Sequence, residues 1–167
     1  MITGLVVTLL FAAPLMMAAY TDYSSMRIPN TVVLALMAAF FVSLPLHWQG
    51  IGVLGEHLGM FASFLAVGFV FFALGWLGGG DAKLMAAIAL WLGWQDAMMF
   101  IVYTTLFGAA IALFLMLSKR FAPVRLRTSA FGMKIYQGDK DMPYGIALAA
   151  GALYVWPSSQ LGLALMS

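Results

Sequence analysis

Long apolar runs separated by short polar connections dominate this chain, and their lengths predict its architecture. A helix needs roughly 20 apolar residues to cross a bilayer. The pattern therefore predicts an all-α integral membrane protein with six transmembrane helices in one domain, residues 1–167. The expected spans lie near 2–20, 31–46, 60–77, 82–94, 97–117 and 143–165.

The connection at 51–59 carries three glycines together with Glu56 and His57. This segment is too polar for a span, so we expect it to lie at the outer interface and assign it no chemistry. His47 and His57 are interpreted as interfacial polar residues, because no carboxylate cluster completes a set of metal ligands around them. We therefore expect no metal site.

Composition narrows the class of protein further. Apolar residues make up 64% of the chain and charged residues only 8%, which a water-soluble domain of this size could not bury in one core. The sequence has no cysteine. Disulfides, thiol nucleophiles and cysteine metal sites are thereby excluded.

Basic residues are distributed unevenly over the predicted connections, and this predicts an orientation. All 8 lysines and arginines fall in the connections after the first, third and fifth spans, whereas Glu56, Asp96 and both histidines fall on the opposite side, with the termini. The positive-inside rule places the basic connections in the cytoplasm and both termini on the extracytoplasmic side. The basic residues are Arg27, Lys83, Lys119, Arg120, Arg125, Arg127, Lys134 and Lys140.

The stretch Gly78-Gly79-Gly80-Asp81-Ala82-Lys83-Leu84 places a carboxylate at the start of a short span. Residues 82–94 would make only about 20 Å of helix, against a hydrocarbon core of about 30 Å. Asp81 is therefore expected in a recess below the cytoplasmic surface. Irregular backbone at that depth is tolerated where it is covered by protein or lines a watery cavity.

Asp22 follows the first predicted span and lies on the same side as Asp81. Each carboxylate could simply cap a helix end, although the carboxyl end of a helix disfavours a negative charge at Asp22. The alternative is a paired catalytic site. The pattern of residues alone leaves both interpretations open.

Two motifs resemble the signature regions of a known family. Asp22 followed by Arg27-Ile28-Pro29-Asn30, together with Gly78–Leu84, closely resembles the type IV prepilin peptidases, which are integral-membrane aspartic proteases of the GxGD class. Pro143-Tyr144-Gly145-Ile146-Ala147 is similar to the family's segment at the start of the last span.

The resemblance implies that Asp22 and Asp81 are the catalytic pair and that no cofactor is needed. Two adjacent carboxylates share one proton, so one can activate water while the other stabilises the developing oxyanion. Substrate-binding or site-forming roles are expected for Gly78, Gly80, Lys83, Arg27, Pro29 and Asn30. Pro29 and Asn30 suit the start of the second span, proline by its fixed φ and asparagine by capping. Lys83 could lower the pKa of a nearby carboxylate or bind the substrate backbone. Alternatively, it extends its ammonium group to the cytoplasmic interface of the membrane.

The compact, cysteine-free chain resembles the form of the family associated with Tad/Flp-type pili. The resemblance implies a peptidase of the bacterial cytoplasmic membrane that cleaves prepilins or pseudopilins, without N-methyltransferase activity. Membrane lipid and pilus-assembly proteins are the other expected partners, and nucleic acid is not. The basic segment at 118–142 suits either an amphipathic segment on anionic lipid or a docking surface for a cytoplasmic protein.

A small proton-coupled transporter or channel subunit is the alternative function. Such proteins place ionisable residues along a path across the membrane, often within inverted repeats. Here the charges gather on one side and neither half of the chain resembles the other, which favours the peptidase.

Overall fold

The computed structural model describes residues 2–121 and 144–166, and every regular element in them is helical. The predicted all-α fold is confirmed for this part of the chain. Residues 122–143, with most of the basic segment and Pro143, lie outside the described residues. The elements are α1 (Ile2–Ser25), α2 (Asn30–Ser43), η1 (Leu44–Leu46), α3 (Ile51–Ala73), α4 (Gly79–Phe121), α7 (Tyr144–Val155), η2 (Trp156–Ser158) and α8 (Gln160–Met166).

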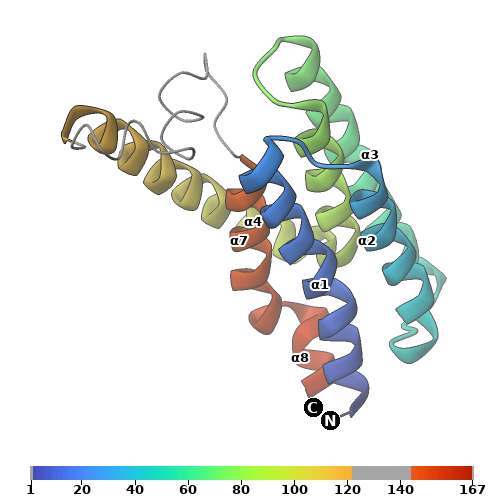
Figure 1. Ribbon diagram of the computed structural model, residues 1–167. Coiled ribbons are helices and arrows are strands. Elements are labelled where there is room, and N and C mark those ends of the chain that lie inside the picture. The colour runs from blue at the N-terminus through green and yellow to red at the C-terminus, as the bar shows by residue number, and fades with distance from the viewer. Residues whose placement is uncertain (1, 122–143, 167) are drawn as a thin grey trace.

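The helices run up and down, so that two ends of the bundle are distinct (Figure 1). The α1–α2 and α3–α4 connections and the start of α7 lie at one end, which we call the motif end. Both chain termini lie at the opposite, terminal end (Figure 1). This arrangement places Asp22 and Asp81 at the same end of the bundle.

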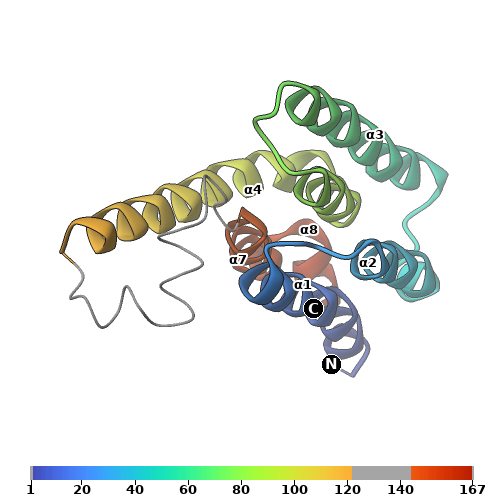
Figure 2. The same ribbon diagram turned by 45° about the horizontal axis from the view of Figure 1, so that its top comes forward.

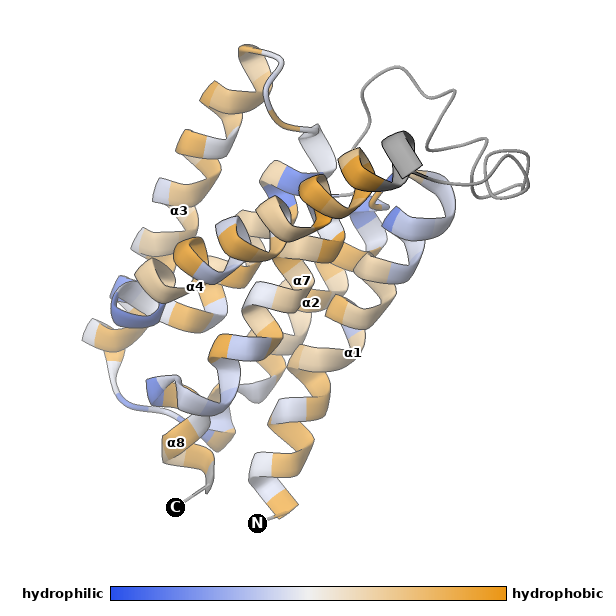
Figure 3. Ribbon diagram, turned by 90° about the vertical axis from the view of Figure 1, so that its left-hand side faces the viewer, coloured by the Kyte–Doolittle hydropathy of each residue, from blue (hydrophilic) through white to orange (hydrophobic). Residues whose placement is uncertain are grey.

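The prediction of six transmembrane spans is not confirmed. Within the described residues, three helices are long and apolar enough to cross a membrane: Ile2–Ser25, Ile51–Ala73 and Gly79–Leu117. Asn30–Leu46 forms a shorter apolar helix. Large apolar side chains such as Leu9, Met16, Phe69 and Phe114 are exposed on the outside of the bundle, and hydrophobic residues follow the lengths of the helices (Figure 3).

The third predicted span begins earlier than expected. The segment at 51–59 is not an interfacial connection but the first turns of α3, which ends at Ala73. Glycine lowers helix stability by only about 1 kcal/mol per residue, and the intervening Val53, Leu54 and Leu58 continue the apolar helix. The three glycines face open space, so their lack of a side chain leaves no cavity.

The last predicted span is interrupted. α7 ends at Val155, the 3-10 turn η2 contains Pro157, and α8 begins at Gln160. Proline cannot donate a backbone hydrogen bond, which explains the break. Ser159 then caps α8, because its Oγ accepts a hydrogen bond from Gly162 N at 3.0 Å.

The predicted connection between the fourth and fifth spans is a sharp break inside α4. Gly93 has φ 67° and ψ −168°, far from helical values, and the second part of the helix turns away from the bundle (Figures 1 and 2). Leu90 O lies in the last turn before this break, where carbonyl groups lack a partner within the helix. His57 of α3 donates a hydrogen bond from Nδ1 to this carbonyl oxygen at 2.7 Å. Because a carbonyl only accepts, this contact fixes the proton on Nδ1.

His57→Ala is expected to destabilise the protein by about 1–3 kcal/mol, because a partly buried carbonyl loses its donor. Thermal unfolding of purified protein in detergent measures the effect. Glu56→Gln, which changes the exposed neighbour of His57, is the control and should unfold like the parent chain. Equal stability of the two variants would contradict a structural role for His57.

A cluster of aromatic rings packs in the interior of the bundle, between α1, α2, α4 and η2. Phe11 stacks on Trp156 with ring centroids 4.4 Å apart, and Trp91 lies 5.2 Å from Phe11 and 5.5 Å from Phe40. The buried Trp91 donates from Nε1 to Leu36 O at 2.9 Å. These contacts connect α1, α2, α4 and η2.

Small residues let α7 approach the second part of α4 closely. A Cβ atom added to Gly151 would lie 2.9 Å from Thr104 N, and one added to Gly108 would lie 3.8 Å from Ala147 Cβ. Close helix contact through small residues is the usual way in which membrane helices pack. This packing brings the start of α7 to the motif end, beside α1.

Candidate active site

Asp22 lies in the last turn of α1, and its side chain is buried, with 5% of its surface exposed. The helix ends at Ser25, and Met26 adopts a left-handed conformation with φ 53°. Its N–H donates to Asp22 O at 2.9 Å, closing the last turn. A left-handed residue after the last turn is a common way to end a helix, and here it directs the chain toward α2.

The Asp22 carboxylate faces the first turn of α7. Ile146 N donates to Asp22 Oδ2 at 3.3 Å, and the N–H of Gly145 is a second donor to the carboxylate. The amino end of a helix carries a partial positive charge. This contact explains how a negative charge is accommodated at the carboxyl end of α1, which would by itself disfavour it.

Asp81 is the third residue of α4 and folds back over the glycine that precedes the helix. The N–H of Gly78 donates to its carboxylate, and a Cβ atom at Gly78 would lie 2.6 Å from Asp81 Oδ2. A carboxylate at this position that accepts from the N-cap N–H is half of a capping box. Asp81 therefore caps α4. Capping of a helix end was one of the two interpretations that the sequence left open for this residue.

Gly80 allows α4 to approach the α1–α2 connection. A Cβ atom at Gly80 would lie 3.2 Å from Ile28 Cβ and 3.3 Å from Ile28 O, and the side chain of Ile28 is buried. The start of α4 therefore packs directly against the segment that follows Asp22.

Asp22 and Asp81 line the same cavity at the motif end. Its volume is about 290 Å³, and the two carboxylates are close enough for an electrostatic interaction between them. Met26, Arg27, Ile28, Gly78, Gly79 and Gly80 form the rest of the lining. Arg27, Gly78 and Gly80 thus lie where the sequence predicted site-forming residues.

Lys83, Pro29 and Asn30 lie beside the cavity rather than in its lining. Lys83 Nζ donates to Asn30 Oδ1 at 3.0 Å, which links the start of α4 to the start of α2. The prediction that Asn30 caps α2 is wrong: Pro29 is the N-cap residue, with φ −63° and ψ 141°, and Asn30 is the first helical residue. Its side chain bonds to Lys83 instead, since proline already sets the start of the helix.

Gly145 and Ile146 are site residues that the sequence reasoning did not identify. The segment Pro143–Ala147 carried a resemblance, but nothing in it indicates that its backbone, rather than a side chain, contacts Asp22. The contact joins residues far apart along the chain, and only the packing of α7 against α1 and α4 creates it.

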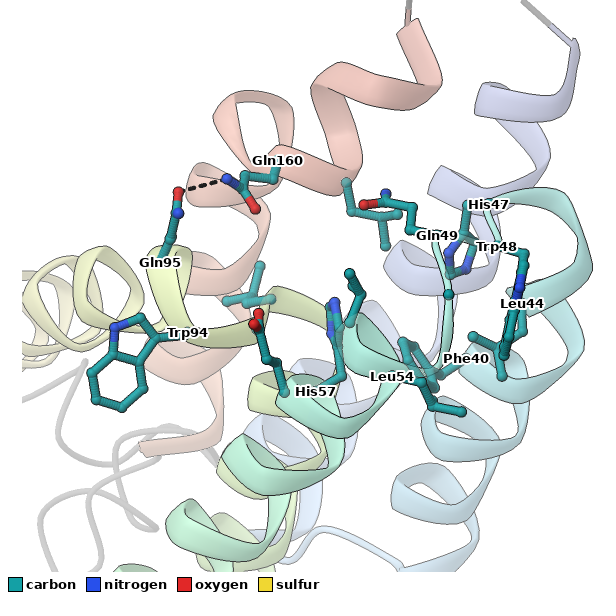
Figure 4. A pocket seen from close by; sticks show the side chains of 16 residues that line it. Phe40, Leu44, His47, Trp48, Gln49, Leu54, His57, Trp94, Gln95 and Gln160 are labelled. Atoms are coloured by element: carbon teal, nitrogen blue, oxygen red, sulfur yellow. Dashed lines mark hydrogen bonds between the residues drawn. The ribbon is translucent and has the colours of Figure 1, made fainter.

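A second, smaller cavity of about 80 Å³ lies between α2, α3, α4 and the start of α8, toward the terminal end (Figure 4). His47 and His57 line it with Gln49, Gln95 and Gln160. Ser43 Oγ lies 3.0 Å from His47 Nε2, and Gln95 and Gln160 bond to each other. No group of three histidine, aspartate or glutamate residues in the described part of the chain could hold a metal ion.

Comparison with known families shows which family the chain belongs to. Residues 9–113 match the model of the type IV leader peptidase family, a stretch that contains both Asp22 and Asp81. The chain belongs to the type IV leader peptidase family. It is therefore a multi-pass membrane protein and a hydrolase, an aspartic prepilin peptidase.

The match to the type IV leader peptidases ends within α4 and does not reach the segment at 143–147, so the resemblance noted there is not part of it. Neither the curated proteins nor the solved structures contain a significant match to the chain.

Proposed function

We propose that this peptidase removes the leader from Flp-like type IV prepilins at the cytoplasmic face of the bacterial inner membrane, with Asp22 and Asp81 as its catalytic pair. The observation that carries the proposal is that both carboxylates line one cavity of about 290 Å³. Family membership supports the reaction and argues against the transporter alternative. The short, cysteine-free connection between α1 and α2 supports the Flp type of substrate.

Hydrolysis between two carboxylates needs one ionised and one protonated member. The ionised carboxylate takes a proton from water as the water oxygen attacks the scissile carbonyl carbon. The protonated carboxylate gives its proton to the carbonyl oxygen, which yields a tetrahedral diol. As the C–N bond breaks, the carboxylate that took the proton from water gives it to the leaving nitrogen. A hydroxyl of the diol gives its proton to the other carboxylate, and the pair returns to its starting state.

The glycines at 78–80 suit the binding of an extended substrate. They leave the cavity wall without side chains, so a peptide backbone can approach both carboxylates. Arg27 contributes the cationic group of the lining. No cofactor or metal takes part in the proposed reaction.

Cleavage of a synthetic prepilin tests the proposal directly. Purified protein in detergent is incubated with a peptide that holds a leader and the following apolar segment, and mass spectrometry locates the cut. We expect one cut at the junction between leader and apolar segment. Cleavage within the apolar segment, or only of unrelated peptides, would contradict the proposed substrate.

The proposed orientation predicts a labelling pattern. Ser24→Cys at the motif end should react with a membrane-impermeant thiol reagent only from the cytoplasmic side, and Gln49→Cys at the terminal end only from outside. Both side chains are exposed, and the parent chain, which has no cysteine, is the unlabelled control. The reason is the location of Arg27 and Lys83 at the motif end. The reverse pattern would invert the orientation and exclude cleavage on the cytoplasmic side.

A further inference from the structure

The first turn of α7 lies outside the part of the chain that matches the family, yet it contacts the Asp22 carboxylate. We infer that the backbone N–H groups of Gly145 and Ile146 hold Asp22 as the ionised member of the pair, so that Asp22 is the general base and Asp81 the general acid. The inference rests on the proposed function and assigns separate roles to its two aspartates.

Burial disfavours a negative charge on Asp22, and the backbone donors of α7 offset that cost. Two backbone donors at the amino end of a helix point at its carboxylate, Ile146 N at 3.3 Å from Oδ2. Hydrogen bonds donated to a carboxylate stabilise its charged form, and the amino end of the helix adds to the effect. α7 runs from Tyr144 to Val155, long enough for its peptide dipoles to add along three turns.

The fit of α7 against Asp22 leaves no room for a side chain. A Cβ atom at Gly145 would lie 2.8 Å from both Asp22 Oδ2 and Ile28 Cδ1. The carboxylate is therefore enclosed by Ile28 on one side and the α7 backbone on another, and with 5% exposure it has little water to solvate its charge. The N–H groups take the place of that water.

Asp81 has a weaker set of donors. One backbone N–H, that of Gly78, donates to its carboxylate. By accessible surface, the Asp81 side chain is half-buried, whereas that of Asp22 is buried. When two adjacent carboxylates share one proton, the proton resides on the member whose charge is less well stabilised. Asp81 thus carries the proton and donates it to the scissile carbonyl oxygen, while Asp22 takes the proton of the attacking water.

In the part of the chain that the structure describes, few other charged groups contribute to this balance. Asp81 of α4 and Arg27 of the α1–α2 connection line the cavity with Asp22. Lys83 of α4 bonds to Asn30 of α2, and Tyr144, the first residue of α7, packs beside Gly108.

Ile146→Pro tests the assignment, because proline lacks the N–H that donates to Asp22 and is tolerated in the first turn of a helix. Tyr144→Pro is the matched control: it removes an N–H of the same turn that is not a donor to Asp22. Rates of cleavage of a synthetic prepilin are measured from pH 4 to 9, and the folded fraction is checked by thermal unfolding.

We expect Ile146→Pro to lower kcat at neutral pH by about 10- to 100-fold, the effect of one hydrogen bond to a charged group, with little change in KM. The acidic limb of the pH–rate profile should move up by about 1–2 pH units, since a base that is harder to ionise is protonated at higher pH. Tyr144→Pro should keep the profile of the parent chain. If the first turn of α7 had only a structural role, Ile146→Pro would lower the rate without moving the acidic limb of the pH–rate profile.

Gly145→Ala is the second variant, because alanine suits a helix but would displace Asp22 from the same donors. It should move the same limb in the same direction. An unchanged profile in both variants, or movement of the alkaline limb instead, would overturn the assignment. Neither result would affect the proposed catalytic pair, which fails instead if Asp22→Asn or Asp81→Asn keeps cleaving prepilin.

Discussion

Asp22→Asn and Asp81→Asn are each expected to reduce prepilin cleavage by at least ~100-fold while the protein stays folded, because asparagine keeps the shape of aspartate but cannot exchange its proton. Turnover of a synthetic prepilin by purified protein in detergent measures the loss. Asp22→Asn also keeps an oxygen that can accept from Ile146 N, so α1 and α7 should remain in contact.

The double variant should be no slower than either single variant, since the two carboxylates act as one unit. Asp96→Asn is the matched control. Asp96 lies toward the terminal end, where Oδ2 accepts from Gln160 N at 2.9 Å, a bond that the asparagine oxygen can keep. Near-native turnover in either well-folded single variant would mean that the pair is not the catalytic machinery.

Gly78→Ala is expected to lower kcat by about 100-fold and to lower stability by about 1 kcal/mol, the contribution of the lost helix cap. The added Cβ atom would lie 2.6 Å from Asp81 Oδ2, closer than van der Waals contact permits. The carboxylate is the free end of its side chain, so it can rotate away and relieve the overlap without disturbing the backbone. Misplacing a reacting group by about 1 Å costs roughly 100-fold in rate.

Gly55→Ala provides the control for this substitution. Gly55 lies in α3 with no atom within 4 Å of an added Cβ, so alanine should leave kcat unchanged and raise stability by about 0.5–1 kcal/mol. Single-turnover rates and thermal unfolding of the two variants separate an effect on the carboxylate from a general effect of alanine. If Gly78→Ala kept full activity, the close contact between Gly78 and Asp81 would have no catalytic importance.

The sequence predicted the candidate site better than it predicted the helices around it. Asp22 and Asp81 could be placed at one end because apolar runs of bilayer length alternate in direction, and the glycines at 78–80 indicated a cavity wall. The contact of Asp22 with Gly145 and Ile146 could not be predicted, because it is made by backbone groups and depends on how α7 packs.

The predicted helix boundaries were wrong at polar and helix-breaking residues. Hydropathy does not show which contacts such residues make in the folded protein. His57 is accommodated within α3 because its Nδ1 donates a hydrogen bond to Leu90 O. Gly93 breaks α4, two residues before the connection that the predicted spans place at residues 95–96. Pro157 divides the last apolar run into a helix too short to cross a bilayer and a second short helix.

The contact between α1 and α7 also bears on when the enzyme becomes active during its synthesis. Both aspartates leave the ribosome long before Ile146, so a nascent or truncated chain that ends in α4 would hold the proposed catalytic pair without the α7 donors to Asp22. Proteolytic competence would then appear only once α7 has inserted beside α1. On this assignment, a chain that lacks α7 would cleave prepilin much more slowly than the complete protein.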